Sequence, residues 1–291
     1  MPVRYSIKDL EKLSGIKAHT LRVWEQRYNL LRPHRTDTNI RYYNDNDLKK
    51  ILNVALLNNK GKKISHIAEL SDSELSKEVD SLVSTSTSTS DQIEGLSISM
   101  IEMDELRFEK IIANNILHFG FERTVEEIIF PFLRQVGIMW QVGVVNPAQE
   151  HFISQLIRQK LIVGIDGLIP KEIKNPKSFI VFLPSGELHE LSVLYYYYLI
   201  KAAGHKCYYL SQSVPLDDLK VVYSIRKSEM LLGIITMALD KISVEEYISN
   251  LSKSFPNSKI LLSGTQVMKL QGSLPKNVKV FLNPTDLRNY L

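Results

Sequence analysis

The sequence predicts a multidomain fold: an α winged helix-turn-helix, then an α-helical four-helix bundle, then an α/β flavodoxin-like (Rossmann-like) parallel sheet. Three observations predict it. Helical periods and an arginine-rich aromatic stretch fill the first part, amphipathic helical patterns fill the middle, and short apolar runs alternate with helical segments from residue 176 on. A length of 291 residues favours two or three domains over one core. The predicted segments are 1–75, a flexible Ser/Thr linker over 76–92, a bundle over 93–170 and a sheet domain over 176–291.

The N-terminal segment opens with a helix and a turn. Ser6 can cap a helix over residues 7–13, because its hydroxyl can accept a hydrogen bond from the first helical turn. Ser14 and Gly15 then give a turn signal, and a second helix starts at Lys17. Two short helices joined in this way predict a helix-turn-helix.

The second helix has two distinct faces. Leu21 and Trp24 are three residues apart and share one face, which we expect to be buried. Arg22 and Gln26 fall on another face, as a recognition helix requires. Residues 33–40 then predict a loop or a two-stranded wing.

A longer helix follows the wing, and order is then lost. Asn44 can cap this helix, which ends within residues 58–61, and a short further helix is predicted over 65–70. Residues 71–90 include the run STSTSTS at 84–90. A tract this polar buries too little surface to offset its ordering entropy, so it predicts a flexible linker.

The middle of the chain, residues 91–168, is predicted to be helical. Apolar side chains recur there at helical spacing in three stretches, and Pro147 marks a helix start. An up-down bundle of four helices would bury them. The stretches are Leu106, Ile111, Ile112 and Ile116; Val125, Ile128, Ile129, Phe132, Leu133 and Val136; and Phe152, Ile153, Leu156, Ile157, Leu161 and Ile162.

The last segment alternates strands with helices. Its predicted strands are short and apolar, which is typical of a parallel sheet covered on both faces. In such a sheet the ligand crevice lies at the carboxyl ends of the strands. The strands are 179–183, 206–210, 231–235, 259–262 and 278–281.

Composition excludes several classes of protein. No apolar run reaches the roughly 18 residues that a membrane helix needs, and no apolar signal segment stands at the N-terminus. Cys207 is the only cysteine, so no intrachain disulfide or cysteine-based metal cluster can form, and we expect a cytoplasmic protein. Motifs such as a Walker phosphate loop, H-E-x-x-H and G-x-S-x-G are missing from the sequence, which predicts no catalytic residues and no enzyme.

Positive charge is concentrated in the first segment. Residues 1–63 hold 14 basic and 6 acidic side chains, a net +8, whereas the rest of the chain holds 22 and 26, a net −4. Guanidinium groups and aromatic rings alternate between residues 20 and 43, which suits phosphate clamping and contact with a DNA groove. A solvated basic face would explain the charge but not its coincidence with helix-turn-helix spacing. Double-stranded DNA is therefore the predicted partner.

The same stretch resembles a known DNA-binding family. The phrases LRVWEQRY at 21–28, PHRT at 33–36 and RYY at 41–43 resemble the winged-helix domain of the MerR superfamily, and Trp24 is similar to its CarA/CarH/LitR-like branch of cobalamin-linked repressors. The resemblance implies that Arg22 and Arg27 contact phosphates or bases in the major groove and that Arg35 and Arg41 serve the wing. It implies a DNA-binding set of Lys17, His19, Thr20, Arg22, Arg27, Arg35, Arg41 and Tyr42.

Two further motifs extend the resemblance. The spacing Trp140-x9-Glu150-His151 is similar to the helical cap of cobalamin-sensing regulators, in which these side chains approach the upper face of the corrin. Glu187-x-His189 follows a predicted strand, where cobalamin domains carry D/E-x-H-x-x-G. The resemblance implies that His189 is the lower ligand of the cobalt of cobalamin, with Glu187 bound to its other ring nitrogen.

The sequence also departs from that pattern. Ser192 replaces the glycine of the motif, Thr236 stands in the loop beside the nucleotide tail, and Ser263-Gly264 replaces a pair of glycines. These four residues complete the implied cofactor-binding set. Photosensing relatives carry a histidine directly after the Trp, where this chain has Gln141, which argues against such a light switch.

Together these features predict a transcriptional regulator that acts as a repressor. Its rear domains, the predicted bundle over 93–170 and the sheet domain over 176–291, are predicted to sense a corrinoid, namely adenosylcobalamin. We expect a homo-oligomer, a dimer or tetramer, because one small winged helix buries little surface on DNA. Two alternatives remain open. The rear domains could be a cofactor-independent protein-interaction or oligomerisation module bound by an antirepressor protein, or a corrinoid carrier for methyl transfer.

Overall fold

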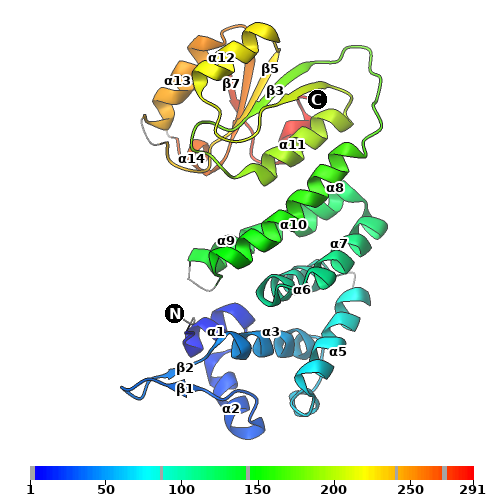
Figure 1. Cartoon of the computed structure of the whole chain (residues 1–291), viewed down its shortest axis with the longest axis vertical. Helices are drawn as coiled ribbons and strands as arrows, with labels where there is room; N and C mark the ends of the chain where they lie inside the picture. Colours follow the sequence, from blue (N-terminus) through cyan, green and yellow to red (C-terminus); the bar gives the residue numbers. More distant parts are fainter. Residues whose placement is uncertain (1–3, 86–87, 142–144, 240–241, 271–273) are drawn as a thin grey trace. The chain divides into compact units, whose positions relative to one another are not determined.

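A computed structural model describes residues 4–85, 88–141, 145–239, 242–270 and 274–291 (Figure 1). The chain divides into two compact units, Met1–Leu156 and Ile157–Leu291. The predicted order of a helix-turn-helix, a helical middle and a parallel sheet is confirmed. No helix in these ranges is long and apolar enough to cross a membrane.

The first unit begins with the predicted winged helix-turn-helix. Ser6 caps the first helix in a capping box with Asp9, and Gly15 ends it with a φ of 71°. The side chain of Asn44 likewise caps the long helix after the wing. The elements are α1 (Ile7–Ser14), α2 (Ala18–Tyr28), β1 (His34–Arg35), β2 (Arg41–Tyr42), α3 (Asp45–Asn59) and α4 (Ile64–Ile67).

A small hydrophobic core holds these elements together. Leu21 and Trp24 of α2 are buried, as the spacing predicted, and they share the core with Leu10 of α1 and Leu48 of α3. Tyr43 is also fully buried, and its backbone exchanges two hydrogen bonds with Tyr5, so the start of the chain is paired with the end of the wing.

The flexible linker predicted over residues 76–92 is corrected by the structure. Helix α5 (Asp72–Thr85) covers most of this range, and α6 begins at Thr89; residues 86–87 lie outside the described residues. Leu75, Val79 and Val83 recur every four residues on α5, and all three are buried. This apolar stripe packs α5 against α3, α6 and α7, and its burial offsets the ordering entropy on which the linker prediction rested.

The rest of the helical segment forms the predicted bundle. Its elements are α6 (Thr89–Glu102), α7 (Glu105–Phe119), α8 (Phe121–Thr124), the π-helical segment η1 (Val125–Ile129), α9 (Phe130–Gln141) and α10 (Pro147–Asp166). Most of the predicted apolar positions are buried, but Leu106 is 73% exposed and Ile162 is also exposed. Leu106 lies in the first turn of α7, where side chains can point away from the neighbouring helices.

The second unit contains a five-stranded parallel sheet. Its strands β3 (Ser178–Phe182), β4 (Lys206–Tyr209), β5 (Met230–Ile234), β6 (Lys259–Ser263) and β7 (Val278–Val280) lie in the order β4-β3-β5-β6-β7. This is the flavodoxin-like order. Strand β4 is added on one side of β3, and β5, β6 and β7 are added on the other side, so the order of the strands reverses between β3 and β5. Each strand lies within one residue or so of its predicted range.

Helices cover both faces of this sheet (Figure 1). They are α11 (Glu190–Ala202), α12 (Leu216–Ile225), α13 (Val244–Ser254), α14 (Thr265–Met268) and α15 (Pro284–Arg288). Leu219 of α12 and Tyr247 of α13 share one core with Ile180, Leu231 and Ile260 of the strands. Helix α11 packs on β3 and β4 and against α15, so the sheet is doubly wound.

Candidate functional site

The predicted DNA-binding residues gather on α2 and the wing, which lie beside each other in the first unit (Figure 1). Helix α2 carries His19, Thr20, Arg22 and Arg27, and all but Thr20 are exposed. Lys17 precedes the helix, and its Nζ lies 3.1 Å from Oε1 of Glu11. The buried face of α2 thus fixes the helix, while its basic face is open to solvent.

The wing is a two-residue ladder closed by a tight turn. His34 pairs with Tyr42, and Arg35 pairs with Arg41. Asn39 has a φ of 64°, and its Oδ1 accepts a hydrogen bond of 2.7 Å from Nη1 of Arg35. The turn therefore holds the Arg35 guanidinium at the end of the wing.

Glu25 of α2 joins the recognition helix to the wing. Its Oε2 accepts a 2.9 Å hydrogen bond from the Tyr43 hydroxyl, and its Oε1 lies 3.6 Å from Nε of Arg41. Burial raises the pKa of Tyr43, and the hydrogen bond to Glu25 raises it further, so the phenol stays a donor. This carboxylate was not among the predicted site residues. In the sequence, Glu25 is the acidic residue that directly follows the buried Trp24.

Tyr42 is held on the wing by two neighbours. The Arg4 guanidinium lies 4.7 Å from the centre of its ring, and the His34 ring stacks on it at 5.3 Å. Nε2 of His34 is 3.1 Å from Nδ2 of Asn44. The structure therefore brings Arg4, which the sequence analysis did not select, to the same surface as Tyr42.

In the second unit, Glu187 organises the loops at the carboxyl ends of β3 and β5. Its side chain is 1% exposed. Oε1 accepts hydrogen bonds from the backbone N of His189 at 3.0 Å and from its Nδ1 at 2.6 Å. Oε2 accepts from the backbone N of Thr236 at 2.6 Å and of Met237 at 2.8 Å. One carboxylate thus ties together the two loops at the point where the strand order reverses.

The protonation state of Glu187 follows from these contacts. Burial alone would raise the pKa of its carboxyl. The hydrogen bonds from His189, Met237 and Thr236 outweigh burial and lower that pKa to about 2. The carboxylate is therefore ionised at neutral pH and accepts a hydrogen bond from Nδ1 of His189, which fixes the orientation of the ring. The His189 side chain is 59% exposed.

Three other predicted cofactor residues lie at the same sheet edge: Thr236 in the loop after β5, Ser263 at the end of β6 and Gly264 directly after it. The Thr236 carbonyl accepts a 2.9 Å hydrogen bond from Oγ1 of Thr265, and the buried Ser263 accepts one of 2.8 Å from the backbone N of Ile235. Gly264 has a φ of 108°, and a Cβ there would overlap the Ile235 carbonyl, so only glycine fits this position. The structure brings these residues together after β5 and β6.

Ser192 and Glu190 lie in the first turn of α11, directly after His189. Ser192 is half-buried in regular helix. The sequence analysis did not select Glu190, although its carboxylate is buried. It forms an ion pair with Arg158 of α10 and accepts hydrogen bonds from the hydroxyls of Tyr209 and Ser211 at 3.3 Å and 3.2 Å.

The remaining predicted cofactor residues belong to the first unit. Trp140 lies near the end of α9 and is 58% exposed, which is unusual for so large an apolar side chain. Glu150 and His151 lie in the first turns of α10. Oε1 of Glu150 accepts a 2.5 Å hydrogen bond from the Ser154 hydroxyl. Oε2 of Glu150 lies 3.6 Å from Nε2 of the exposed His151. Gln141 is the last residue of α9.

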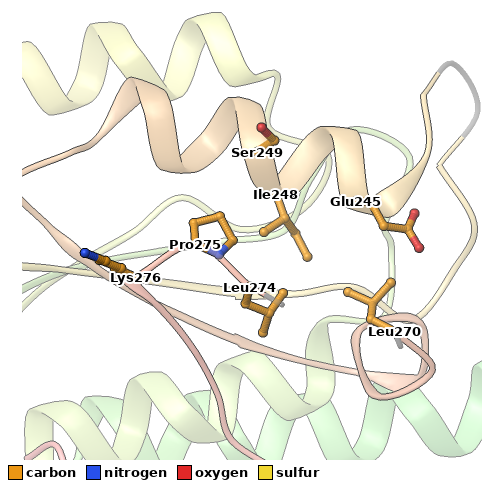
Figure 2. Close-up of a pocket in the computed structure, with 7 residues that line it drawn as sticks. All are labelled: Glu245, Ile248, Ser249, Leu270, Leu274, Pro275 and Lys276. Carbon is orange, nitrogen blue, oxygen red and sulfur yellow. The ribbon is translucent and has the colours of Figure 1, made fainter. Parts of the chain in front are cut away.

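A surface pocket in the second unit is lined by a different set of residues. It has a volume of about 390 Å³ and is lined by Glu245, Ile248, Ser249, Leu270, Leu274, Pro275 and Lys276. Figure 2 shows Ile248 of α13 opposite Leu270 and Leu274. None of the predicted site residues lines it.

Two protein families and several curated proteins match stretches of this chain. Residues 5–74 match the MerR HTH family regulatory protein family, and residues 92–163 match the B12 binding domain family. The HTH-type transcriptional repressor CarH of Myxococcus xanthus is 26% identical over 242 residues, which are 80% of this chain and 79% of CarH. CarA of the same organism is 27% identical over 222 residues, 74% of this chain and 70% of CarA.

A solved structure supports the fold of the rear domains. The monomethylamine corrinoid protein of Methanosarcina barkeri has a TM-score of 0.56 at 12% identity and covers 70% of this chain and 98% of its own. At this identity the likeness shows the fold alone. CarH and CarA are named as transcription regulators rather than enzymes, as the sequence predicted for this chain. The protein thus joins a MerR helix-turn-helix module to a B12 binding domain and is homologous to the CarH and CarA transcriptional repressors.

Proposed function

We propose that the protein is a DNA-binding transcriptional repressor whose rear domains sense a corrinoid. The pairing of Glu187 with His189 is the observation that carries the proposal. A buried, ionised carboxylate orients an exposed imidazole at the sheet edge where this fold binds ligands. Such a carboxylate-histidine pair is the usual arrangement behind a metal-ligating histidine.

The residues present fit a cobalt-containing corrinoid. Imidazole suits a borderline transition metal, and Nε2 is the ring nitrogen of His189 that is not bonded to Glu187. When bound, the corrinoid would supply a cobalt ion that His189 would ligate. In the second unit Ser192, Thr236, Ser263 and Gly264 would help to hold the corrinoid, and in the first unit Trp140, Glu150 and His151 are the residues proposed to contact it. The adenosyl form is part of the proposal.

Within the first unit, side-chain contacts join the helical bundle to the DNA-binding head, the segment from α1 to α4. The buried Arg107 of α7 donates to Asp80 and Ser76 of α5 at 2.7 Å and 2.8 Å. It also donates to Glu102 of α6 at 2.6 Å, and Glu102 accepts a 3.2 Å hydrogen bond from Asn53 of α3. A ligand that prefers one arrangement of the bundle would therefore bias the position of α3 and the head.

The proposed partners follow from the DNA-binding surface on α2 and the wing. Operator DNA would bind α2 and the wing through Lys17, His19, Arg22 and the other predicted residues of that surface. We propose that the chain acts as a homo-oligomer in the cytoplasm, because one winged helix alone gives little specificity. An antirepressor protein remains a further candidate partner.

Titration of the full chain with adenosylcobalamin tests the sensor. We expect the corrin absorption to co-elute with the protein in size-exclusion chromatography, and His189→Ala to abolish or shift that spectrum. His118→Ala is the matched control, because His118 is an exposed histidine on α7 outside the proposed site. Hydroxocobalamin in parallel tests the adenosyl preference. If no corrinoid co-elutes, or if both variants behave alike, the cofactor proposal is wrong.

A DNA assay separates the cofactor-independent alternative. Affinity for duplex DNA is measured with and without adenosylcobalamin. A change in affinity supports sensing, whereas DNA binding that ignores a bound corrinoid would contradict it. The intact Glu187–His189 pair favours sensing over the alternative, since a pure interaction module has no need of an oriented imidazole.

A further inference from the structure

We infer that Val23 and Gln26 of α2 read the base edges of an A·T-containing step, while Arg22 and Arg27 hold the phosphates on either side. The inference rests on the proposed DNA-binding function and adds the class of sequence that the head recognises. Neither Val23 nor Gln26 belongs to the DNA-binding set implied by the sequence. Both are exposed on α2.

The angular position of each side chain separates the two roles. Successive residues of an α-helix are rotated by about 100°. On α2 this places Arg22 and Arg27 at the two edges of the exposed arc. His19, Val23 and Gln26 lie along its middle. A helix in the major groove points the middle of its exposed arc at the base edges and its flanks at the two backbones.

The orientation of this arc is fixed by contacts on the other side of α2. Leu21 and Trp24 are buried in the core of the head. Glu25 is joined to Tyr43 by a 2.9 Å hydrogen bond and lies 3.6 Å from Arg41 of the wing. The helix therefore cannot rotate without breaking these contacts, and the same side chains face the groove each time.

The chemistry of the two central side chains points to A·T pairs. Val23 is 49% exposed, an apolar side chain in the most basic part of the chain. The thymine methyl is the apolar group that the major groove presents. Gln26 offers an amide donor and acceptor one helical turn away, the pattern that pairs with N6 and N7 of adenine. A basic side chain at either position would favour guanine instead.

Selection of duplexes supplies the probe for the test. Full-length protein is incubated with a pool of random 20-base-pair duplexes, and the bound fraction is amplified and sequenced. The enriched duplex is then remade with deoxyuridine for each thymine, which removes only the methyl group, and with 7-deazaadenine for each adenine, which removes N7. Loss of one buried methyl contact should weaken binding about fourfold, and loss of the N7 contact roughly tenfold.

The variants assign each loss to a residue. With Val23→Ala we expect the deoxyuridine effect to vanish at one thymine, and with Gln26→Ala the 7-deazaadenine effect to vanish at one adenine. Both substitutions are at exposed helical positions, so folding is kept. Val221→Ala is the matched control, because Val221 is similarly exposed on α12 of the second unit. Arg22→Ala should weaken all duplexes alike and keep both base effects.

The outcomes distinguish this inference from the function on which it rests. Enrichment of duplexes whose thymine and adenine effects persist in Val23→Ala and Gln26→Ala would overturn the inference and leave DNA binding standing. Enrichment of a motif without an A·T pair would do the same. Failure to enrich any duplex at low salt would overturn both the inference and the proposed DNA binding.

Discussion

Replacing Glu187 with glutamine tests the centre of the candidate corrinoid site without removing its shape. In the native chain, four N–H donors converge on the Glu187 carboxylate: the backbone and Nδ1 of His189, and the backbone N of Thr236 and Met237. Glutamine has one acceptor oxygen and one NH2 group. At least two of the four donors would then face a donor, and each buried donor without an acceptor costs about 1–3 kcal/mol.

The pKa of Glu187 expresses the same four contacts as a pH dependence of stability. Its pKa is lowered from an ordinary 4.5 to about 2, which corresponds to roughly 3 kcal/mol of stabilisation by the ionised form. Because the folded-state pKa lies below the unfolded one, this contribution is complete above about pH 4.5. It decreases as the pH falls through that value and is lost near pH 2.

The assay combines a local and a global measurement. Hydrogen exchange of the backbone amides of Thr236 and Met237 reports the loop, and urea unfolding at a series of pH values reports the second unit. We expect Glu187→Gln to speed exchange of these two amides by up to about 100-fold and to flatten the loss of stability between pH 5 and 2. Glu172→Gln is the control, because Glu172 is exposed. If both variants exchange alike and keep the same pH profile, the carboxylate does not organise these loops.

Three further predictions concern single side chains in the two units. Arg22→Ala should lower DNA affinity while leaving thermal unfolding unchanged, and should reduce the salt dependence of binding by about one counterion, measured by fluorescence anisotropy at several salt concentrations. Gly264→Ala should destabilise the second unit by about 2 kcal/mol or more in urea, because a Cβ would overlap the Ile235 carbonyl. Arg107→Met should cost about 1–3 kcal/mol in thermal unfolding, because it removes the charge-assisted hydrogen bonds of a buried guanidinium to the partly exposed Asp80 and Glu102, whereas Arg123→Ala at an exposed pair should cost less than about 1 kcal/mol. Equal effects of the two arginine variants would refute the assignment.

Local patterns predicted the elements well wherever burial follows a regular period. All five strands of the sheet lie close to their predicted ranges, because a parallel strand covered on both faces is a short apolar run. The caps at Ser6 and Asn44 were also predicted, since a cap depends only on residues three positions away. Helix α5 was missed because its stripe of Leu75, Val79 and Val83 runs into a Ser/Thr tract, and the composition of the tract was given more weight than the stripe.

Contacts between distant residues were the part that the sequence could not supply. The motif predicted that Glu187 binds His189, two residues away, but not that it also binds the backbone of Thr236 and Met237, because backbone amides leave no mark in the sequence. The ion pair between Arg158 and Glu190 was also not predicted, because the two side chains are 32 positions apart and no local pattern connects them.

That ion pair lies within the second unit, next to the proposed cobalt ligand. Helix α10 begins in the first unit with Glu150 and His151, and its last residues belong to the second unit. Arg158 on this helix pairs with Glu190, the residue after the proposed cobalt ligand His189. A change in the position of His189 would therefore alter the ion pair between Glu190 and Arg158. Substitution of Arg158 should perturb the proposed corrinoid site without removing its histidine, so a corrin spectrum that is unchanged in Arg158→Ala would contradict a role for this ion pair.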